Sequence, residues 1–380
     1  MEIEQLSQNI DIKKYLLNLG VDSGGIAIMS AKAKHHILYI RNLHVGAANI
    51  LKQDALSIGA DLAVPRGTVI ASEKYVDCIL FASQKELSIL SKKELAQPFG
   101  LKEIAKEFKK ISQIKKPQSV SLMGILNINT DSFYSKSRLG EKNILHAINS
   151  MIEDGADIID IGGVSSRPNS IAVSADEELN RVRDVIDCVR ENKLHEQAKF
   201  SLDSYTPKVI SHALESGFSI VNDITGLRND EVCKLCASYK ATAVIMHMQK
   251  TPKDMQEDPI YENILTDITS FFAKQIERAS SYGVEDIILD VGIGFGKTLE
   301  HNIALIKHHK HFTQFNKPLL VGASRKSMIN EIIPSTTEER LAGTLAIHIE
   351  AVNNGASIIR AHDIKEHFQA LKVKQAIDNF

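Results

Sequence analysis

Side chains capable of chemistry stand at the ends of eight apolar segments within residues 118–380. They are carboxylates, amides, cations, imidazoles and thioethers: Asn127, Asp160, Asp203, Asn222, Met246-His247-Met248, Asp290, Ser324-Arg325-Lys326, Arg360 and His362. One subset combines two carboxylates, an amide and an ammonium group: Asp203, Asn222, Asp290 and Lys326. This inventory suits a flat heterocycle rich in N–H donors and acceptors, because a carboxylate accepts paired N–H bonds and an amide both donates and accepts. For any single residue the alternative is a polar side chain that ends a strand in a wet loop. The convergence of all eight favours a site.

Arg360 and His362 leave the same segment at a spacing of two, which places both side chains on one face of a strand. A guanidinium beside an imidazole suits the oxygens of a phosphate. The alternative is an ion pair that only stabilises the fold, for example with Asp363. These residues therefore predict an anion site next to the heterocycle site.

Two glycine-rich segments also follow strand ends. Residues 294–297 (GFGK) come after Asp290, and residues 162–168 (GGVSSRP) add hydroxyls and one arginine. Glycine allows the backbone to approach a ligand closely. Neither segment matches GxGxxG or GxxxxGK[ST], so no nucleotide fingerprint is present.

Other motifs are better explained by structure than by chemistry. Cys233 and Cys236 lie in a predicted helix without a second pair at zinc spacing. The histidines of residues 308–311 follow a helix and are expected on a solvated face. The lysine-rich stretch 102–116 lacks the aromatic platform that nucleic-acid binding uses, so it is expected to be a solvated helix face. His247 is expected to be a buried structural imidazole, with one flanking methionine on the ligand face and the other on the barrel wall.

The eight segments are nearly continuous apolar runs, as expected of parallel strands buried on both faces: 120–127, 157–162, 200–204, 220–224, 242–248, 286–292, 318–324 and 357–362. Stretches of helical period follow them: 142–154, 175–191, 207–216, 230–239, 262–282, 299–309, 337–353 and 365–376. Four glycines stand where such helices would end: Gly155, Gly217, Gly283 and Gly355. Eight β-α units of this size predict a closed (β/α)8 barrel of the α/β class, whose active site lies at the C-terminal ends of the strands.

A boundary is expected at Pro117, where the basic stretch 101–117 ends. Residues 1–117 hold 17 Lys and Arg against 12 Asp and Glu, a net charge of +5, whereas residues 118–380 carry −7. This asymmetry favours two modules, an N-terminal module over 1–117 and a catalytic barrel over 118–380. In the N-terminal part, strands are expected at 25–29, 35–40 and 76–82, and helices at 46–58 and 84–95. We expect a small α/β module, to which no residue chemistry can be assigned.

The whole-chain composition excludes several classes of protein. Of 380 residues, 43% are apolar and 24% charged, a globular balance that excludes intrinsic disorder as the main state. The net charge of −2 provides no global field for nucleic acid or an acidic membrane. Four cysteines are too few for a disulfide scaffold and suggest the reducing cytoplasm. No apolar run is long enough to span a membrane, and the acidic start is not typical of a signal peptide.

Residues 118–376 resemble dihydropteroate synthase, a family of pterin-binding barrels. The resemblance rests on eight motifs in family order: MGILNINTDSF (123–133), DIGGVSSRP (160–168), SLDS (201–204), VNDI (221–224), MHMQ (246–249), DVGIGFGK (290–297), SRKS (324–327) and IRAHD (359–363). The first motif and SRKS are the most specific. The others occur in looser form in related pterin-binding barrels.

The resemblance implies a reaction of folate biosynthesis. The amine of p-aminobenzoate would attack the exocyclic CH₂ of 6-hydroxymethyl-7,8-dihydropterin diphosphate, diphosphate would leave with Mg²⁺, and 7,8-dihydropteroate would form. The implied pterin site comprises Asp203, Asn222, Ile224, Met246, Asp290, Gly294 and Lys326. The implied diphosphate site comprises Asn127, Arg360 and His362, with Asn127 also coordinating the metal. The implied p-aminobenzoate site, which sulfonamides would also occupy, comprises Phe133, Ser166, Arg167, Pro168, Phe295, Ser324 and Lys326.

By this carry-over the catalytic residues are Asn127, Lys326, Arg360 and His362, and a homodimer is expected. An aniline needs placement more than a base, and an electron-rich pterin can share positive charge at the CH₂, which favours an SN1-like path. The chain departs from the usual family pattern at Asn129-Thr130, Val164, Ser166, Val291 and Ile293. None of these departures removes a pterin or diphosphate ligand, so they bear on loop dynamics and sulfonamide affinity.

Three alternatives to this interpretation make different demands on the residues. A corrinoid-linked methyltetrahydrofolate methyltransferase shares the pterin-binding barrel but needs no diphosphate set. A non-catalytic pterin-binding module would likewise not need Asn127, Arg360 and His362. A fused pterin pyrophosphokinase in the N-terminal module is rejected because no paired-carboxylate magnesium motif stands there. A scaffold, an oligomer contact or a loop-gating element is favoured for residues 1–117.

Overall fold

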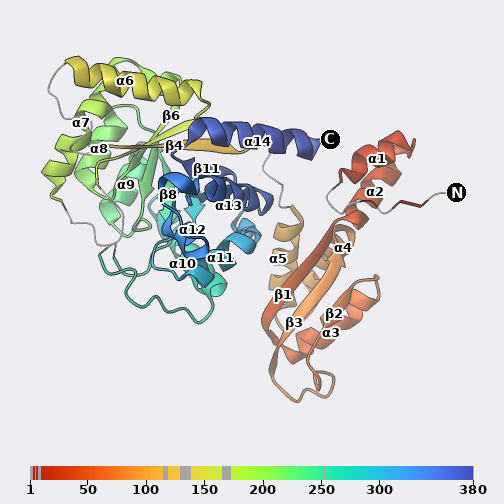
Figure 1. Cartoon of the computed structure of the whole chain (residues 1–380). Coiled ribbons are helices and arrows are strands. Elements are labelled where there is room, and N and C mark those ends of the chain that lie inside the picture. Colours follow the sequence, from red (N-terminus) through yellow and green to blue (C-terminus); the bar gives the residue numbers. More distant parts are fainter. Residues whose placement is uncertain are drawn as a thin grey trace. The chain divides into compact units, whose positions relative to one another are not determined.

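The computed structural model describes residues 3, 4, 6, 10–113, 119–128, 138–164, 173–251 and 253–379. The chain divides into two compact units, residues 1–115 and 116–378. They are coloured red to orange and yellow to blue in Figure 1. No helix in the described part of the chain is both long and apolar enough to span a membrane.

The N-terminal unit is a three-stranded antiparallel sheet with helices. Its strands are β1 (His35–His44), β2 (Asp61–Ala63) and β3 (Tyr75–Ser83), in the order β1-β3-β2. Its helices are α1 (Ile12–Asn18), α2 (Ser23–Ala33), α3 (Val45–Leu56), α4 (Gln84–Lys93), the 3-10 turn η1 (Glu94–Ala96) and α5 (Leu101–Gln113). Alternate residues of β3, such as Cys78 and Leu80, enter a core with Leu51 of α3 and Phe108 of α5.

The strand predicted at 25–29 is wrong, because these residues lie in the helix α2. Asp22 caps this helix, since its carboxylate accepts a hydrogen bond from the Gly25 N–H at 2.9 Å. A short apolar run such as GIAIM does not distinguish strand from helix by periodicity. The strands predicted at 35–40 and 76–82 correspond to β1 and β3, and the predicted helices at 46–58 and 84–95 correspond to α3 and α4.

The second unit is a closed barrel of eight parallel strands, which confirms the predicted fold class. The strands are β4 (Ser121–Asn127), β5 (Ile158–Gly162), β6 (Lys199–Asp203), β7 (Ile220–Asp223), β8 (Thr242–Met246), β9 (Ile287–Asp290), β10 (Leu319–Val321) and β11 (Ile358–Ala361). They pair in chain order, and β11 closes the barrel against β4.

The helices of this unit follow the strands: α6 (Arg138–Glu153), α7 (Ala175–Glu191), α8 (Pro207–Glu215), α9 (Asp230–Ser238), α10 (Ile264–Ser281), α11 (Leu299–Lys307), α12 (Ser327–Ile332), α13 (Leu341–Asn353) and α14 (Ile364–Asn379). Short 3-10 turns are η2 (Leu194–Glu196), η3 (His309–Phe315) and η4 (Glu338–Arg340). The four glycines predicted to end helices all adopt positive φ, from 87° to 102°.

Two apolar cores hold the barrel together. One lies between strands and helices and includes Ile161, Phe200 and Phe272. The other fills the barrel interior with one side chain from seven strands: Met123, Ile158, Ile220, Val244, Ile288, Leu320 and Ile358. Of the histidines expected on a solvated face, His308 and His311 are exposed, but His309 is buried at 1% exposure, so that prediction is wrong for His309. Its ring packs edge-on against Phe312, a contact that the sequence pattern does not reveal.

Candidate active site

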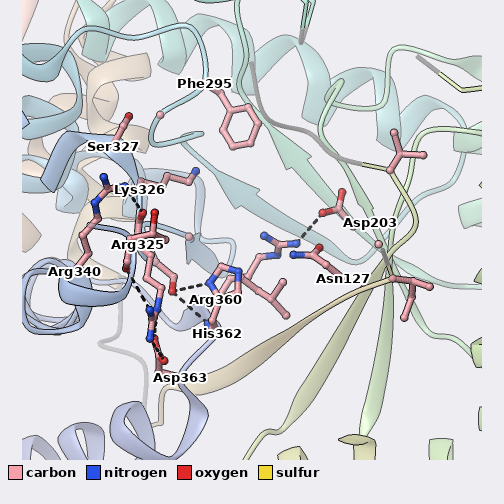
Figure 2. A pocket seen from close by; sticks show the side chains of 18 of the residues that line it. Asn127, Asp203, Phe295, Arg325, Lys326, Ser327, Arg340, Arg360, His362 and Asp363 are labelled. Atoms are coloured by element: carbon pink, nitrogen blue, oxygen red, sulfur yellow. Dashed lines mark hydrogen bonds and ion pairs between the residues drawn. The ribbon is translucent and has the colours of Figure 1, made fainter. Parts of the chain in front are cut away.

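A cavity of about 890 Å³ opens at the C-terminal ends of the barrel strands (Figure 2). Strand geometry explains its chemistry, because side chains two residues apart point to the same face. Two residues beyond the apolar layer of the barrel interior, the strands therefore present a second inward layer: Ile125, Asp160, Asp203, Asn222, Met246, Asp290, Gly322 and Arg360. This second layer is rich in polar side chains, and several of its members form the floor of the cavity.

Eight of the residues expected in the site line this cavity: Asn127, Asp203, Gly294, Phe295, Ser324, Lys326, Arg360 and His362. Four others are buried in the same end of the barrel without lining it: Asn222, Ile224, Met246 and Asp290. The remaining four, Phe133, Ser166, Arg167 and Pro168, lie outside the described residues, as does Thr130.

Arg360 crosses the floor of the cavity to reach two carboxylates. Its Nε donates to Asp160 Oδ2 at 2.6 Å. Its Nη2 donates to Asp203 Oδ2 at 2.7 Å, the contact drawn in Figure 2. Asn222 Nδ2 donates to the same Asp160 oxygen at 3.0 Å. The pair with Asp363 that sequence reasoning held as an alternative for Arg360 does not form, because that carboxylate binds Arg325 instead.

One guanidinium thus serves two buried carboxylates. Burial raises the pKa of Asp203 to about 7, and the neighbouring Asp160 adds to this rise, while Arg360 opposes it. Burial lowers the pKa of Arg360, but Asp160 and Asp203 outweigh that effect and keep the guanidinium charged. The floor therefore combines a fixed cation with a carboxylate that gains or loses a proton near neutral pH.

Lys326 and Phe295 line another wall of the cavity. The Lys326 ammonium lies 4.2 Å from the centroid of the Phe295 ring and donates a hydrogen bond to the Ile293 carbonyl. Burial lowers the pKa of Lys326 to about 8, against the effect of Asp290. Asp290 is itself buried, which raises its pKa, and its Oδ1 accepts the Gly292 N–H at 2.7 Å. A cation and an aromatic ring therefore share this wall, next to a buried acceptor.

The rim of the cavity joins the loops that follow β10 and β11. Ser324 Oγ lies 3.0 Å from His362 Nδ1 and accepts the His362 backbone N–H at 3.2 Å. Arg325 forms a two-pronged ion pair with Asp363, with distances of 2.9 and 2.6 Å. Arg325 has a positive φ of 54°, an uncommon conformation for a residue with a side chain. These contacts hold the two loops together where Ser324, Lys326 and His362 enter the cavity.

Lys297, the last residue of the GFGK segment, is buried beside the cavity wall. Its ammonium donates to the carbonyls of Phe295 at 2.8 Å and His247 at 3.2 Å, and lies 3.1 Å from His247 Nδ1. Burial and the adjacent Lys297 lower the pKa of His247 to about 2, so this imidazole is neutral. Both methionines that flank His247 pack in one apolar cluster with Ile224, Met255 and Phe295.

Sequence reasoning missed some residues of the site. The pattern places Asp160 at a strand end, but it does not indicate that Asp160 is the partner of Arg360 and Asn222. Arg181 of α7 and Arg340, the last residue of the 3-10 turn η4 just before α13, also line the cavity. No spacing in the sequence indicates this, because it depends on how the helices pack on the barrel.

The donor atoms available for Mg²⁺ are few. No group of three or more His, Cys, Asp or Glu side chains that could hold a metal occurs among the residues that the structure describes. Asn127 is exposed at the cavity and offers a single amide oxygen. Mg²⁺ commonly takes one or two protein ligands and completes its shell with water and substrate phosphate oxygens. The donor atoms of the described residues therefore fit a magnesium ion that takes most of its ligands from water and an anionic substrate.

Comparison with known proteins gives consistent matches. The model of the family described as pterin binding enzyme matches residues 123–362. A Helicobacter pylori protein named bifunctional dihydropteroate synthase/dihydropteroate reductase is 42% identical over 367 residues, which cover 97% of each chain. The dihydropteroate synthase of Escherichia coli K12 is 41% identical over 262 residues, 67% of this chain and 90% of that protein.

A solved structure agrees with these matches. The structure of Yersinia pestis dihydropteroate synthase in complex with a sulfonamide drug matches with a TM-score of 0.65 and 35% identity. The match covers 70% of this chain and 97% of the Yersinia chain.

Proposed function

Because the chain belongs to the dihydropteroate synthase family of pterin-binding enzymes, we propose that the cavity of its barrel is the active site. The enzyme is a transferase of folate biosynthesis that joins p-aminobenzoate to 6-hydroxymethyl-7,8-dihydropterin diphosphate, giving 7,8-dihydropteroate and diphosphate. The observation that supports this location is the convergence of Asp203, Lys326 and Arg360, from three distant parts of the sequence, on one cavity.

The pterin ring would bind at the floor of the cavity. The carboxylates of Asp203 and Asp290 are acceptors for the ring N–H groups, and Asn222 and Lys326 supply donors. Ile224 and Met246 form an apolar cluster beside them, which suits the faces of a flat ring. Gly294 lines the cavity without a side chain, which allows close approach.

The diphosphate would lie against Asn127, Arg360 and His362, all of which line the cavity. When the C–O bond breaks, negative charge grows on the leaving group, and a fixed guanidinium stabilises that charge. Asn127, Lys326, Arg360 and His362 are therefore the residues to which we assign catalysis. Mg²⁺ held by Asn127 and the substrate would neutralise part of the diphosphate charge.

p-Aminobenzoate would bind next to Phe295, Ser324 and Lys326, and sulfonamides would compete for the same place. Phe133, Ser166, Arg167 and Pro168 complete the proposed set. The aromatic ring of Phe295 and the ammonium of Lys326 match the ring and the carboxylate of the substrate. Since an aniline is already a nucleophile, these residues would place it rather than activate it, along an SN1-like path.

The test is an assay of diphosphate release by the full chain. Diphosphate should be released when p-aminobenzoate and Mg²⁺ are present, and mass spectrometry should detect 7,8-dihydropteroate only when both are present. A sulfonamide should inhibit competitively with p-aminobenzoate. Product formation unaffected by Lys326→Ala would contradict the proposed site.

We also infer a second activity from the length of the matches. The Helicobacter relative, whose name includes dihydropteroate reductase, covers 97% of this chain, while the Escherichia synthase covers 67%, about the share of the barrel unit. The N-terminal unit accounts for the difference, and a reductase function for it is therefore our proposal. Incubation of the chain with 7,8-dihydropteroate and NADH or NADPH should yield tetrahydropteroate, detected by mass spectrometry. Its absence with both donors would count against this activity.

Two further proposals concern assembly and location. Exposed apolar side chains on α14, namely Phe368, Val373 and Ile377, support a homodimer, which light scattering on the purified chain would detect. None of the four cysteines forms a disulfide, which supports a location in the cytoplasm. Cell fractionation tests that location.

A further inference from the structure

Two buried histidines lie beneath the loops at the rim of the cavity. His348 belongs to α13 and His367 to the first turn of α14, and each is 1% exposed. They link Ala323, just after β10, with Asp363, just after β11. Neither histidine lines the cavity, and neither belongs to one of the eight family motifs.

The hydrogen bonds of this link have a fixed direction. The Ala323 backbone N–H can only donate, so His348 Nε2, 3.0 Å away, must be an acceptor. The proton of a neutral His348 therefore lies on Nδ1 and is donated to His367 Nε2 at 2.8 Å. His367 then carries its proton on Nδ1, where it is donated to the Asp363 carbonyl at 2.5 Å. Only two neutral imidazoles satisfy every bond, and burial, which lowers the pKa of both, favours this state.

Helix α13 holds the β10 loop at a second point one helical turn earlier. Thr344, which is fully buried, accepts the Arg325 N–H with its Oγ1 at 2.9 Å. Residues four apart share one helix face. Thr344 and His348 therefore hold two backbone N–H groups of one short turn, the turn in which Arg325 adopts positive φ.

This turn carries Ser324 and Lys326 into the cavity, and the loop held by His367 carries His362. We propose that His348 and His367 are positioning residues that fix these two loops for the transfer of the pterinylmethyl group to p-aminobenzoate. The proposal rests on the site assigned above. A loop displaced by an ångström would misplace the attacking amine, an effect that costs turnover even when the fold is intact.

The test compares three variants of His348 in the full chain. His348→Leu removes both bonds and leaves the Ala323 N–H buried without an acceptor. We expect kcat/KM for p-aminobenzoate to fall about tenfold, the equivalent of about 1.4 kcal/mol. In His348→Gln, the amide oxygen can reach the position of Nε2 and accept the Ala323 N–H, so most of the lost kcat/KM should be recovered. In His348→Asn, the shorter amide reaches only the position of Nδ1, next to His367, so kcat/KM should stay low. Free 6-hydroxymethylpterin has proposed contacts with Asp203 and Asn222 of other strands as well as with Lys326 of this turn, so its binding should weaken less than kcat/KM falls, by about threefold at most.

His309→Gln is the matched control, because His309 is equally buried but packs on Phe312 away from the cavity. It should leave kcat/KM unchanged. The proposal is overturned if His348→Leu keeps wild-type kcat/KM, if His348→Gln is no better than His348→Leu, or if the control loses as much. Full activity of Lys326→Ala in the same assay would overturn the proposed active site itself, and the positioning role with it.

Discussion

The two units of this chain place their polar residues by different rules. In the barrel, eight parallel strands all end at one edge, so residues far apart in the sequence meet in one cavity. In the N-terminal unit the strands are antiparallel, and their ends alternate between opposite edges. Its polar groups are therefore dispersed. Tyr39 donates a hydrogen bond to Asp77 on an exposed face of the sheet, whereas Glu94 is buried at η1. Function can be located from sequence where topology gathers the strand ends, and not where it disperses them.

The units also differ in how they treat a buried carboxylate. In the barrel, Asp160 and Asp203 share the guanidinium of Arg360. In the N-terminal unit, the fully buried Glu94 lies beside the Asp54 carboxylate, to which it can donate only when it is protonated, and no ion pair to Glu94 is found among the described residues. A paired buried charge suits a site that must hold a charged ligand, whereas an unpaired one reduces stability unless it is protonated.

Removal of residues 1–115 tests the comparison most severely. If the units divide the two activities, the barrel alone should lose reductase activity completely and keep synthase activity within about threefold of the full chain. Both activities are measured on the same preparations, after circular dichroism has shown that the barrel remains folded. Reductase activity in the folded barrel would show that the division of labour is wrong.

Arg360→Ala should have the next largest effect. It removes the cation proposed to stabilise the leaving group, and we expect kcat to fall about 10³-fold, as when other fixed charge-stabilising groups are removed. It also leaves Asp160 and Asp203 without their partner, which should destabilise the barrel by about 3 kcal/mol. Kinetics and thermal unfolding measure the two effects. The exposed Arg190, which pairs with Asp187 on the same helix α7, supplies the control substitution Arg190→Ala.

The sequence predicts more of the barrel than of the N-terminal unit. The barrel strands are continuous apolar runs, so their positions and the polar residues at their ends could be predicted. The partner of Arg360 could not, because the choice between Asp363 and the Asp160–Asp203 pair depends on side-chain direction across the barrel. The contributions of Arg181 and Arg340 depend on helix packing. In the N-terminal unit, the five-residue apolar run 25–29 predicts a strand but forms part of α2, because so short a run does not distinguish strand from helix.

Protonation of Asp203 in the barrel should have a smaller effect, on the pH dependence of kcat/KM. The pKa of this carboxyl is raised to about 7 by burial and then by Asp160. The ionised form is the one that accepts N–H groups, so kcat/KM for the pterin substrate should fall about tenfold per pH unit below about 7. Asp160→Asn removes one of the negative charges and should move this acid limb to lower pH. An unchanged limb in Asp160→Asn would show that Asp203 does not control it.

Glu94 of the N-terminal unit should give the smallest effect, on stability alone. Burial raises its pKa from 4.5 to about 7, with Asp54 adding to the rise. Between these two values the folded unit holds a proton that the unfolded chain has lost. The free energy of unfolding should therefore decrease as pH rises, by about 1.4 kcal/mol per pH unit, and level off above about 7.

Glu94→Gln replaces the carboxylate by a neutral amide of the same shape and should abolish this pH dependence. Thermal unfolding of the full chain between pH 5 and 8 measures it, and the substitution should stabilise the N-terminal unit at the alkaline end while leaving synthase kcat unchanged. The exposed Glu103, which pairs with Lys106 on α5, is the control, since Glu103→Gln should leave the slope in place. A slope that survives in Glu94→Gln would assign it to another group. A fall in synthase kcat would show that the N-terminal unit and the barrel are coupled, contrary to the contrast drawn between them.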